Sequence, residues 1–171
     1  MQRRSTLMWI GRLGLGGLGA LALAGCGFKL RSSHDYSFSS LAVAPNPGGP
    51  LAMELRRTLG SVVHVLAPDE DPARAQLVID ILQEQREKVV VGVNSSGQIR
   101  EFQLRIRLKF RVRTPQGHEL LPDAEIVQQR DVSFNESAAL AKEAEEVLLY
   151  RDMQIDIVQQ VMRRLATVRL G

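Results

Sequence analysis

The segment from Leu104 to Arg113 constrains the fold of this chain more than any other, because apolar and basic residues alternate along it at every position. The apolar positions are Leu104, Ile106, Leu108, Phe110 and Val112, and the basic positions are Arg105, Arg107, Lys109, Arg111 and Arg113. Side chains of a strand point alternately to the two faces of a sheet. The pattern therefore predicts a strand over residues 99–114, in a sheet with one covered face and one basic face.

Other segments fit strands beside this one. A long apolar pattern runs over residues 77–91 and ends at the turn residues Asn94-Ser95-Ser96-Gly97. A second turn, Pro115-Gln116-Gly117-His118, precedes a third pattern over residues 125–134. Runs of this kind separated by turn residues predict antiparallel hairpins. Shorter apolar runs at 41–44 and 62–66 fit short strands.

Two amphipathic helices are expected to cover the sheet. The first begins at Pro50, carries Leu51, Leu55 and Leu59 on one side, and stops at Gly60. The second follows Ser137 and shows an apolar stripe through Leu165 with no Gly or Pro. We therefore predict an α+β fold, a two-layer sandwich in which two helices cover a mostly antiparallel sheet of about four strands.

The N-terminus has the parts of a lipoprotein signal peptide. Three arginines precede an apolar run over residues 13–24, which as a helix of about 18 Å is too short for a bilayer core of about 30 Å. The run closes with Leu23-Ala24-Gly25-Cys26, which resembles a bacterial lipobox. We expect cleavage before Cys26 and transfer of a diacylglyceryl group to its thiolate sulfur, although a free cysteine after an ordinary signal peptide is the alternative.

This reading divides the chain into three parts. Residues 1–25 are a signal peptide that is removed, residues 26–40 are a serine-rich tether that begins at the lipid anchor, and residues 41–171 are one domain. Removing residues 1–25 takes away three of the 22 Lys and Arg side chains and no acid, which leaves 19 basic against 19 acidic side chains. This balance, together with an aromatic content of 5%, excludes a nucleic-acid binder.

No combination of residues points to catalysis. Cys26 is the one cysteine, and the three histidines lack the spacing of metal ligands. The sequence also lacks a Gly-rich phosphate loop and a Gly-x-Ser-x-Gly motif. We predict that the protein is not an enzyme and that it holds no metal and no cofactor beyond the covalent lipid on Cys26.

The basic row over residues 105–113 has two interpretations. Its five cations, about 6.6 Å apart, repel one another unless something neutralises them. Acids on neighbouring strands are one answer, and the candidates are Asp80, Glu84, Glu125 and Asp131. An anionic ligand is the other. Gly27 follows Cys26, where an aspartate would signal retention at the inner membrane, so we expect the outer membrane. A lipoprotein there meets the phosphorylated head of lipopolysaccharide. The pattern leaves both interpretations open.

Several segments taken together resemble the LptE family of lipopolysaccharide-assembly lipoproteins. They are Cys26-Gly27-Phe28-Lys29-Leu30-Arg31, Glu101-Phe102-Gln103-Leu104, Phe134-Asn135 with Ala139-Leu140-Ala141-Lys142-Glu143, and residues 159–165. The resemblance implies a sheet covered by two helices and a role without catalysis. It also implies that the chain is held by its lipid in the inner leaflet of the outer membrane, on the periplasmic side. There it would plug the LptD β-barrel, which places lipopolysaccharide in the outer leaflet.

The resemblance further implies residues that contact lipopolysaccharide. Lys142 stands at a family position tied to this contact. The second family position lies in the turn over residues 94–97, which has no cation here. We expect that the contact either shifts to Arg100 or to Arg105 and Arg107 on the basic strand, or is dispensable. The alternative function is a generic envelope lipoprotein that acts as an auxiliary binding subunit of another transport complex.

Overall fold

The computed structural model describes residues 35–45 and 48–170. The strands are β1 (Ser40–Ala44), β2 (His64–Val65), β3 (Leu77–Val93), β4 (Ile99–Arg113) and β5 (Glu119–Ser133). The α-helices are α1 (Pro50–Leu59) and α2 (Ala139–Leu165), and the short 3-10 helices are η1 (Pro72–Arg74) and η2 (Glu136–Ala138). The expected signal peptide, Cys26 and the first residues of the expected tether lie outside the described residues.

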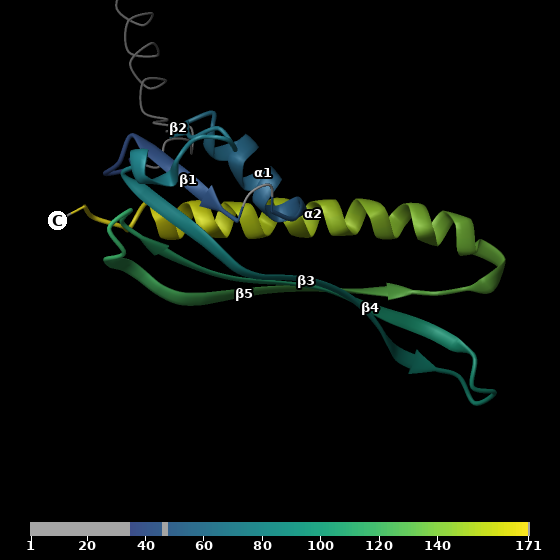
Figure 1. Ribbon diagram of the computed structural model, residues 1–171. Coiled ribbons are helices and arrows are strands. Elements are labelled where there is room, and N and C mark those ends of the chain that lie inside the picture. The colour runs from purple at the N-terminus through teal and green to yellow at the C-terminus, as the bar shows by residue number, and fades with distance from the viewer. Residues whose placement is uncertain (1–34, 46–47, 171) are drawn as a thin grey trace, which may run out of the picture. The chain divides into compact units, whose positions relative to one another are not determined.

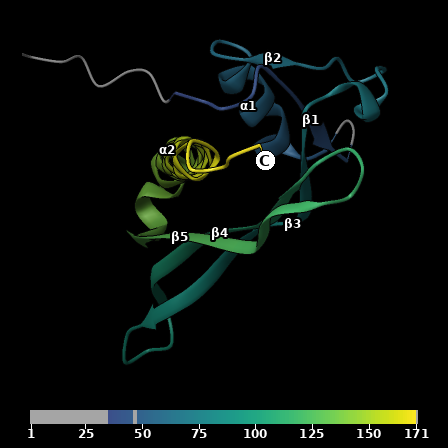
Figure 2. The ribbon, with the colours of Figure 1, turned by 90° about the vertical axis from the view of Figure 1, so that its left-hand side faces the viewer.

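The strands form one sheet in the order β2-β1-β3-β4-β5 (Figure 1). Antiparallel pairing joins β3, β4 and β5, whereas β1 pairs in parallel with β2 and with the start of β3. Both helices lie on the same side of the sheet (Figure 2). The predicted two-layer α+β sandwich is thus confirmed. The sheet has five strands instead of about four, because the two-residue β2 extends its edge.

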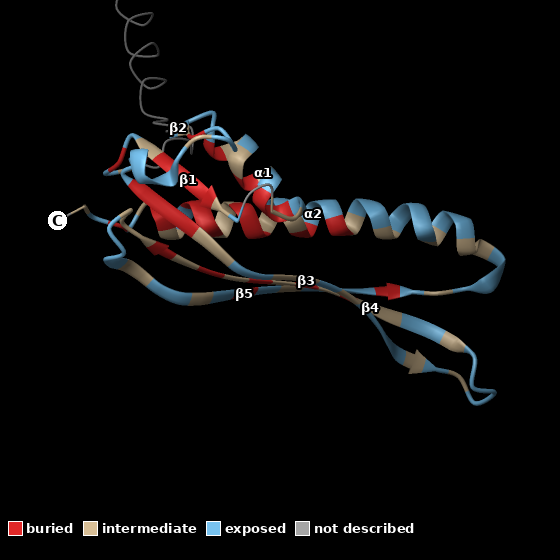
Figure 3. Cartoon of the chain, viewed as in Figure 1, coloured by how far each residue is buried: buried red, intermediate tan, exposed pale blue. Residues whose placement is uncertain are grey.

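The core lies between the covered face of the sheet and the two helices. The five apolar side chains of the alternating row on β4 are at most 2% exposed. Leu51, Leu55 and Leu59 of α1 pack with them, as do the buried residues of α2, which are Tyr150, Met153, Ile157, Val158, Val161, Met162 and Leu165. Figure 3 shows that buried residues gather around α1 and the second half of α2, while the first half of α2 and the tip of the β3–β4 hairpin are largely exposed.

The N-terminal segment joins the domain before residue 41. Phe38 is buried in the core, and the ring of Tyr36 packs beside it with centroids 5.2 Å apart. The hydroxyl of Ser37 donates a hydrogen bond to the carbonyl of Val168 at 2.8 Å, and β1 begins at Ser40. The predicted tether is therefore wrong for residues 36–40, because two aromatic side chains among the serines have apolar surface to bury. Its part before residue 35 stays a prediction.

A carboxylate on β3 fixes the pairing of β3 with β4 on the uncovered face. Oδ2 of Asp80 accepts hydrogen bonds from Nε of Arg111 at 2.9 Å and from Nε of Arg113 at 2.7 Å. Burial by itself raises the pKa of Asp80, but the two guanidinium groups outweigh it, so the pKa lies below its ordinary value. Asp80 therefore stabilises the fold in its charged form.

An irregularity in β3 moves Glu84 to the covered face. The pairing shifts between Ile81 and Gln83, so Glu84 lies opposite Leu108 and not beside the basic row. Its Oε1 accepts a hydrogen bond from the backbone N–H of Leu51 at 2.9 Å, in the first turn of α1. The N-cap residue of α1 is Gly49, which has no side chain for this purpose, so Glu84 caps the helix from another strand.

Replacing Glu84 by alanine should lower the free energy of unfolding by about 1 kcal/mol, because α1 loses its cap. Glu84→Gln keeps an acceptor oxygen and should lose less. Gly49→Ala should resemble Glu84→Ala, because a Cβ on Gly49 would collide with the carboxylate. Urea unfolding followed by circular dichroism measures all three variants. A Glu84→Ala protein as stable as the wild type would contradict the cap.

Asp80→Asn should lower the free energy of unfolding at pH 7 by about 1 kcal/mol, because two charge-assisted hydrogen bonds weaken. Since the folded pKa is depressed, this contribution is complete above the unfolded value of about 4 and is lost as the pH falls through the folded value. The difference from wild type should therefore shrink below about pH 4. Asp123→Asn is the matched control and should change little, because its pair with Lys109 is about half exposed. A gap between Asp80→Asn and wild type that stays constant from pH 7 to pH 3 would refute the assignment.

Candidate functional site

The five cations of the basic row on β4, from Arg105 to Arg113, lie on the uncovered face between two strands that carry acids. Each cation of this row has an acidic partner within 4 Å. The pairs beyond those of Asp80 are Arg105 with Glu87 at 3.7 Å, Arg107 with Glu125 at 2.8 Å, and Lys109 with Asp123 at 3.2 Å. Cross-strand acids thus neutralise the row, which is the first of the two interpretations of its pattern.

The acids differ in part from those expected. Asp80 and Glu125 pair with the row as predicted. Asp131 instead accepts a hydrogen bond from Gln103 at 2.9 Å, and Glu84 lies on the other face. Because Arg105 and Arg107 already have partners, an anionic ligand would have to compete with Glu87 and Glu125 for them.

Lys142 lies near the start of α2. Its Nζ is 2.7 Å from Oε2 of Glu145 and 3.2 Å from the hydroxyl of Ser133, at the end of β5. Glu146, one turn along the helix from Lys142, pairs with Lys88 of β3 at 2.6 Å. These contacts hold the first half of α2 to the sheet through polar groups, whereas apolar packing holds the second half.

A cavity of about 230 Å³ lies between the start of α2 and the sheet. Its polar lining residues are Lys88, Lys142, Glu143 and Glu146, and its apolar lining residues are Phe102, Leu104, Val132, Phe134 and Ala139. The rings of Phe102 and Phe134 meet edge to face with centroids 5.2 Å apart, and Nζ of Lys88 lies 4.4 Å from the Phe102 centroid. The cavity thus combines ammonium groups with aromatic surface, which suits a group that is anionic at one end and apolar at the other.

Arg100 stands apart from this cavity. It is exposed near the start of β4, and its carbonyl accepts a hydrogen bond from the backbone N–H of Phe134 at 2.7 Å. Its guanidinium makes no ion pair with any residue that the structure describes. Of the predicted contact residues, Lys142 lines the same cavity as Lys88. Arg100 has no ion-pair partner among residues 35–45 and 48–170, and Arg105 and Arg107 lie on the uncovered face of the sheet. The sequence pattern gave no reason to single out Lys88.

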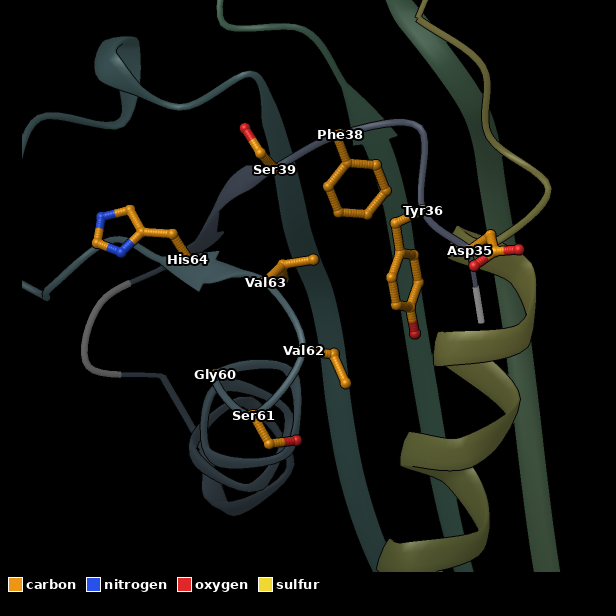
Figure 4. A pocket seen from close by; sticks show the side chains of 9 residues that line it. All are labelled: Asp35, Tyr36, Phe38, Ser39, Gly60, Ser61, Val62, Val63 and His64. Carbon is orange, nitrogen blue, oxygen red and sulfur yellow. The ribbon is translucent and has the colours of Figure 1, made fainter. Parts of the chain in front are cut away.

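A second hollow, of about 600 Å³, lies where the N-terminal segment passes α1 and β2 (Figure 4). Its lining residues are Asp35, Tyr36, Phe38, Ser39, Gly60, Ser61, Val62, Val63 and His64. The imidazole of His64 points away from Tyr36 in Figure 4, and burial raises the pKa of the Tyr36 hydroxyl. This lining brings no nucleophile and base together.

Among residues 35–45 and 48–170, no three His, Cys, Asp or Glu side chains gather in a way that could hold a metal ion. No helix in the same ranges has the length and the apolar character needed to span a bilayer.

The family model and the similar proteins of known name both point to the same family. The chain matches the family LptE, described as lipopolysaccharide-assembly, over residues 38–165. A protein of Yersinia pestis (strain Pestoides F) named LPS-assembly lipoprotein LptE is 31% identical over 155 residues, which are 89% of this chain and 73% of that protein. The protein of the same name from Yersinia pseudotuberculosis serotype O:1b matches with the same values.

Solved structures share the fold. The solution structure of an uncharacterized lipoprotein B from Nitrosomonas europaea superposes with a TM-score of 0.69 at 32% identity, covering 82% of this chain and 90% of that one. The crystal structure of the rare lipoprotein B from Shewanella oneidensis has a TM-score of 0.60 at 21% identity, covering 75% of this chain and 94% of that one. Since the family match spans the described fold from Phe38 to the last residue of α2, this chain belongs to the LptE family of lipopolysaccharide-assembly lipoproteins.

Proposed function

We propose that this chain is an outer-membrane lipoprotein that plugs and braces the LptD β-barrel and assists the assembly of lipopolysaccharide at the cell surface. A lipid on Cys26 holds it in the inner leaflet of the outer membrane, on the periplasmic side. The observation that carries the proposal is the family match over residues 38–165, with relatives named LPS-assembly lipoproteins. The lipobox that ends at Cys26, just before this region, supports the anchor.

The charge pairing on the uncovered face of the sheet supports the proposed role as a plug. The lumen of an outer-membrane barrel is polar. A face on which each cation of the basic row from Arg105 to Arg113 has an acidic partner is polar without carrying a large charge of one sign. Such a face can rest against a polar wall without burying an unpaired charge. The role is one of binding and bracing, so we propose no catalysis, no metal and no cofactor beyond the lipid.

Contact with lipopolysaccharide is proposed at Lys142 and Arg100, with Arg105 and Arg107 as weaker candidates. Lys142 lines the aromatic cavity together with Lys88, and this arrangement suits a phosphate that is attached to an apolar group. Arg100 offers an exposed guanidinium. The ion pairs of Lys142 and Lys88 with glutamates are partly exposed, so a phosphate can replace the carboxylates at small cost.

The barrel partnership is tested by purification of the tagged, lipidated chain in mild detergent. We expect one large outer-membrane barrel to co-purify at a constant ratio. Cys26→Ala should remain uncleaved, take up no labelled palmitate and lose the barrel, because the chain no longer reaches the outer membrane. A tagged wild-type chain that brings down no barrel, or whose depletion leaves surface lipopolysaccharide intact, would favour the generic envelope lipoprotein.

The contact residues are tested by binding of purified lipopolysaccharide at low and high salt. Arg100→Ala and Lys142→Ala should each weaken binding about fivefold at low salt, because a cation near a charged lipid surface contributes about 1 kcal/mol. The effect should fade as salt screens the charges. The double change Arg105→Gln and Arg107→Gln should weaken binding less. Lys109→Ala is the matched control for Arg105 and Arg107, because Lys109 lies on the same uncovered face of the sheet. Low-salt affinity that is unchanged in Arg100→Ala and Lys142→Ala would remove both residues as contacts.

A further inference from the structure

The apolar packing of α2 begins only at Tyr150. No residue from Ala139 to Leu149 is buried, so this part of the helix adds no side chain to the core. The buried residues of α2 run from Tyr150 to Leu165, and Figure 3 shows the same contrast between the two halves of the helix. Segments with few buried apolar contacts are the least stable parts of a fold. We call residues 139–149 the lid, because they lie over a cavity.

The cavity of about 230 Å³ lies between the lid and the covered face of the sheet. The sheet lines it with residues that include Leu104 and Val132, which are 0% and 6% exposed. Atoms that face a cavity lack neighbours on that side and lose the attraction that those neighbours would supply. The lid therefore gains little from packing on the sheet, although it helps to keep Leu104 and Val132 away from water.

Polar contacts hold the lid where apolar packing is missing. Nζ of Lys88 on β3 lies 2.6 Å from Oε2 of Glu146, and 37% and 19% of the two side chains are exposed. Nζ of Lys142 lies 3.2 Å from the hydroxyl of Ser133 at the end of β5. An ion pair that is partly exposed contributes little stability and weakens as the salt concentration rises. The lid is thus held by contacts that are easily exchanged.

Tyr150 marks the residue at which α2 becomes fixed to the sheet. Its hydroxyl donates a hydrogen bond to the carbonyl of Glu87 at 2.6 Å, and Cζ of Arg86 lies 3.3 Å from the centroid of its ring. Both contacts come from β3. Since residues 139–165 contain no Gly or Pro at which the helix could kink, the lid leaves the sheet by unwinding its turns up to Tyr150.

We propose that the lid unwinds locally while residues 150–165 stay packed, and that this opening admits a ligand to the rings of Phe102 and Phe134. Lys88 closes the lid through Glu146 and also lines the cavity. An anionic group that binds Lys88 takes it from Glu146 and so releases the lid, while an apolar part of the same ligand fills the cavity. The opening is a property of the chain alone. Only its use in admitting lipopolysaccharide rests on the contacts proposed above.

The first test measures how fast a buried thiol reacts with a maleimide in the mature lipidated chain, whose one native cysteine, Cys26, carries the lipid. Val132→Cys places the thiol in the cavity under the lid. Ile126→Cys is the matched control on the same face of β5, because Ile126 is 3% exposed and packs in the core with the second half of α2. We expect Val132→Cys to react at least tenfold faster. Equal rates would overturn the lid.

The second test concerns the ion pair that closes the lid. Lys88→Ala should speed the reaction of Val132→Cys about threefold, because a partly exposed ion pair is lost, and should leave Ile126→Cys unchanged. Lys109→Ala, which removes an ion pair on the uncovered face, should change neither rate. Raising the salt from about 0.05 M to about 0.5 M should speed Val132→Cys, but not when Lys88→Ala is also present. A rate at Val132→Cys that ignores both Lys88→Ala and salt would refute the proposed closure.

Hydrogen exchange of the wild-type chain tests the unwinding itself. The backbone N–H groups of residues 143–149 should exchange at least tenfold faster than those of residues 155–165, because unwinding breaks their hydrogen bonds. Equal protection of both segments would overturn the proposal. Lipopolysaccharide binding by a chain whose two segments are equally protected would overturn the lid and leave the proposed function intact. Fast exchange of residues 143–149 in a chain that binds no lipopolysaccharide would support the lid and remove the proposed contact.

Discussion

The packing of the apolar row of β4 against α1 and α2 is the interaction on which the rest of the structure depends. Because side chains alternate along a strand, burying Leu104 through Val112 places five cations on the opposite face. Strands β3 and β5 must then supply acids, and they do so through Asp80, Glu87, Asp123 and Glu125. A slip of one residue would exchange the two rows and bury the cations. One register therefore sets both the core and the charged face.

Local patterns predicted the elements that depend on local chemistry. Alternation identified β4, and Pro50, the leucine spacing and Gly60 identified α1. Two predictions were wrong where contacts between residues far apart in the sequence determine the structure. The β3 irregularity at Leu82 brings Glu84 to the start of α1, and no local period reveals this contact. β5 begins at Glu119 and not at residue 125, because the sheet accommodates Pro122 at a shift in the pairing between Phe110 and Val112.

The proposed contact residues likewise could not be identified from local sequence patterns. Lys142 and Arg100 were predicted from resemblance to a family, since a lysine on a helix and an arginine near the start of a strand have no distinctive pattern of their own. In the sequence, Lys88 is one of several charged residues in β3, next to Arg86 and Glu87. Its place beside Phe102 and Glu146 exists only once the start of α2 lies over the sheet. The partners of the basic row were predictable in kind but only partly in identity: Asp80 and Glu125 were among the candidates, whereas Glu87 and Asp123 depend on a strand register that the sequence does not reveal.

Close pairing of opposite charges on the uncovered face has a consequence for how partners arrive. Fields of alternating sign cancel within a short distance from a surface, and physiological salt shortens that distance further. This face therefore does little to draw a charged molecule in from afar or to speed its encounter. Specific binding to this face therefore depends on short-range contacts. A partner surface has to place its own charges and hydrogen-bonding groups against each arginine or lysine and the carboxylate paired with it.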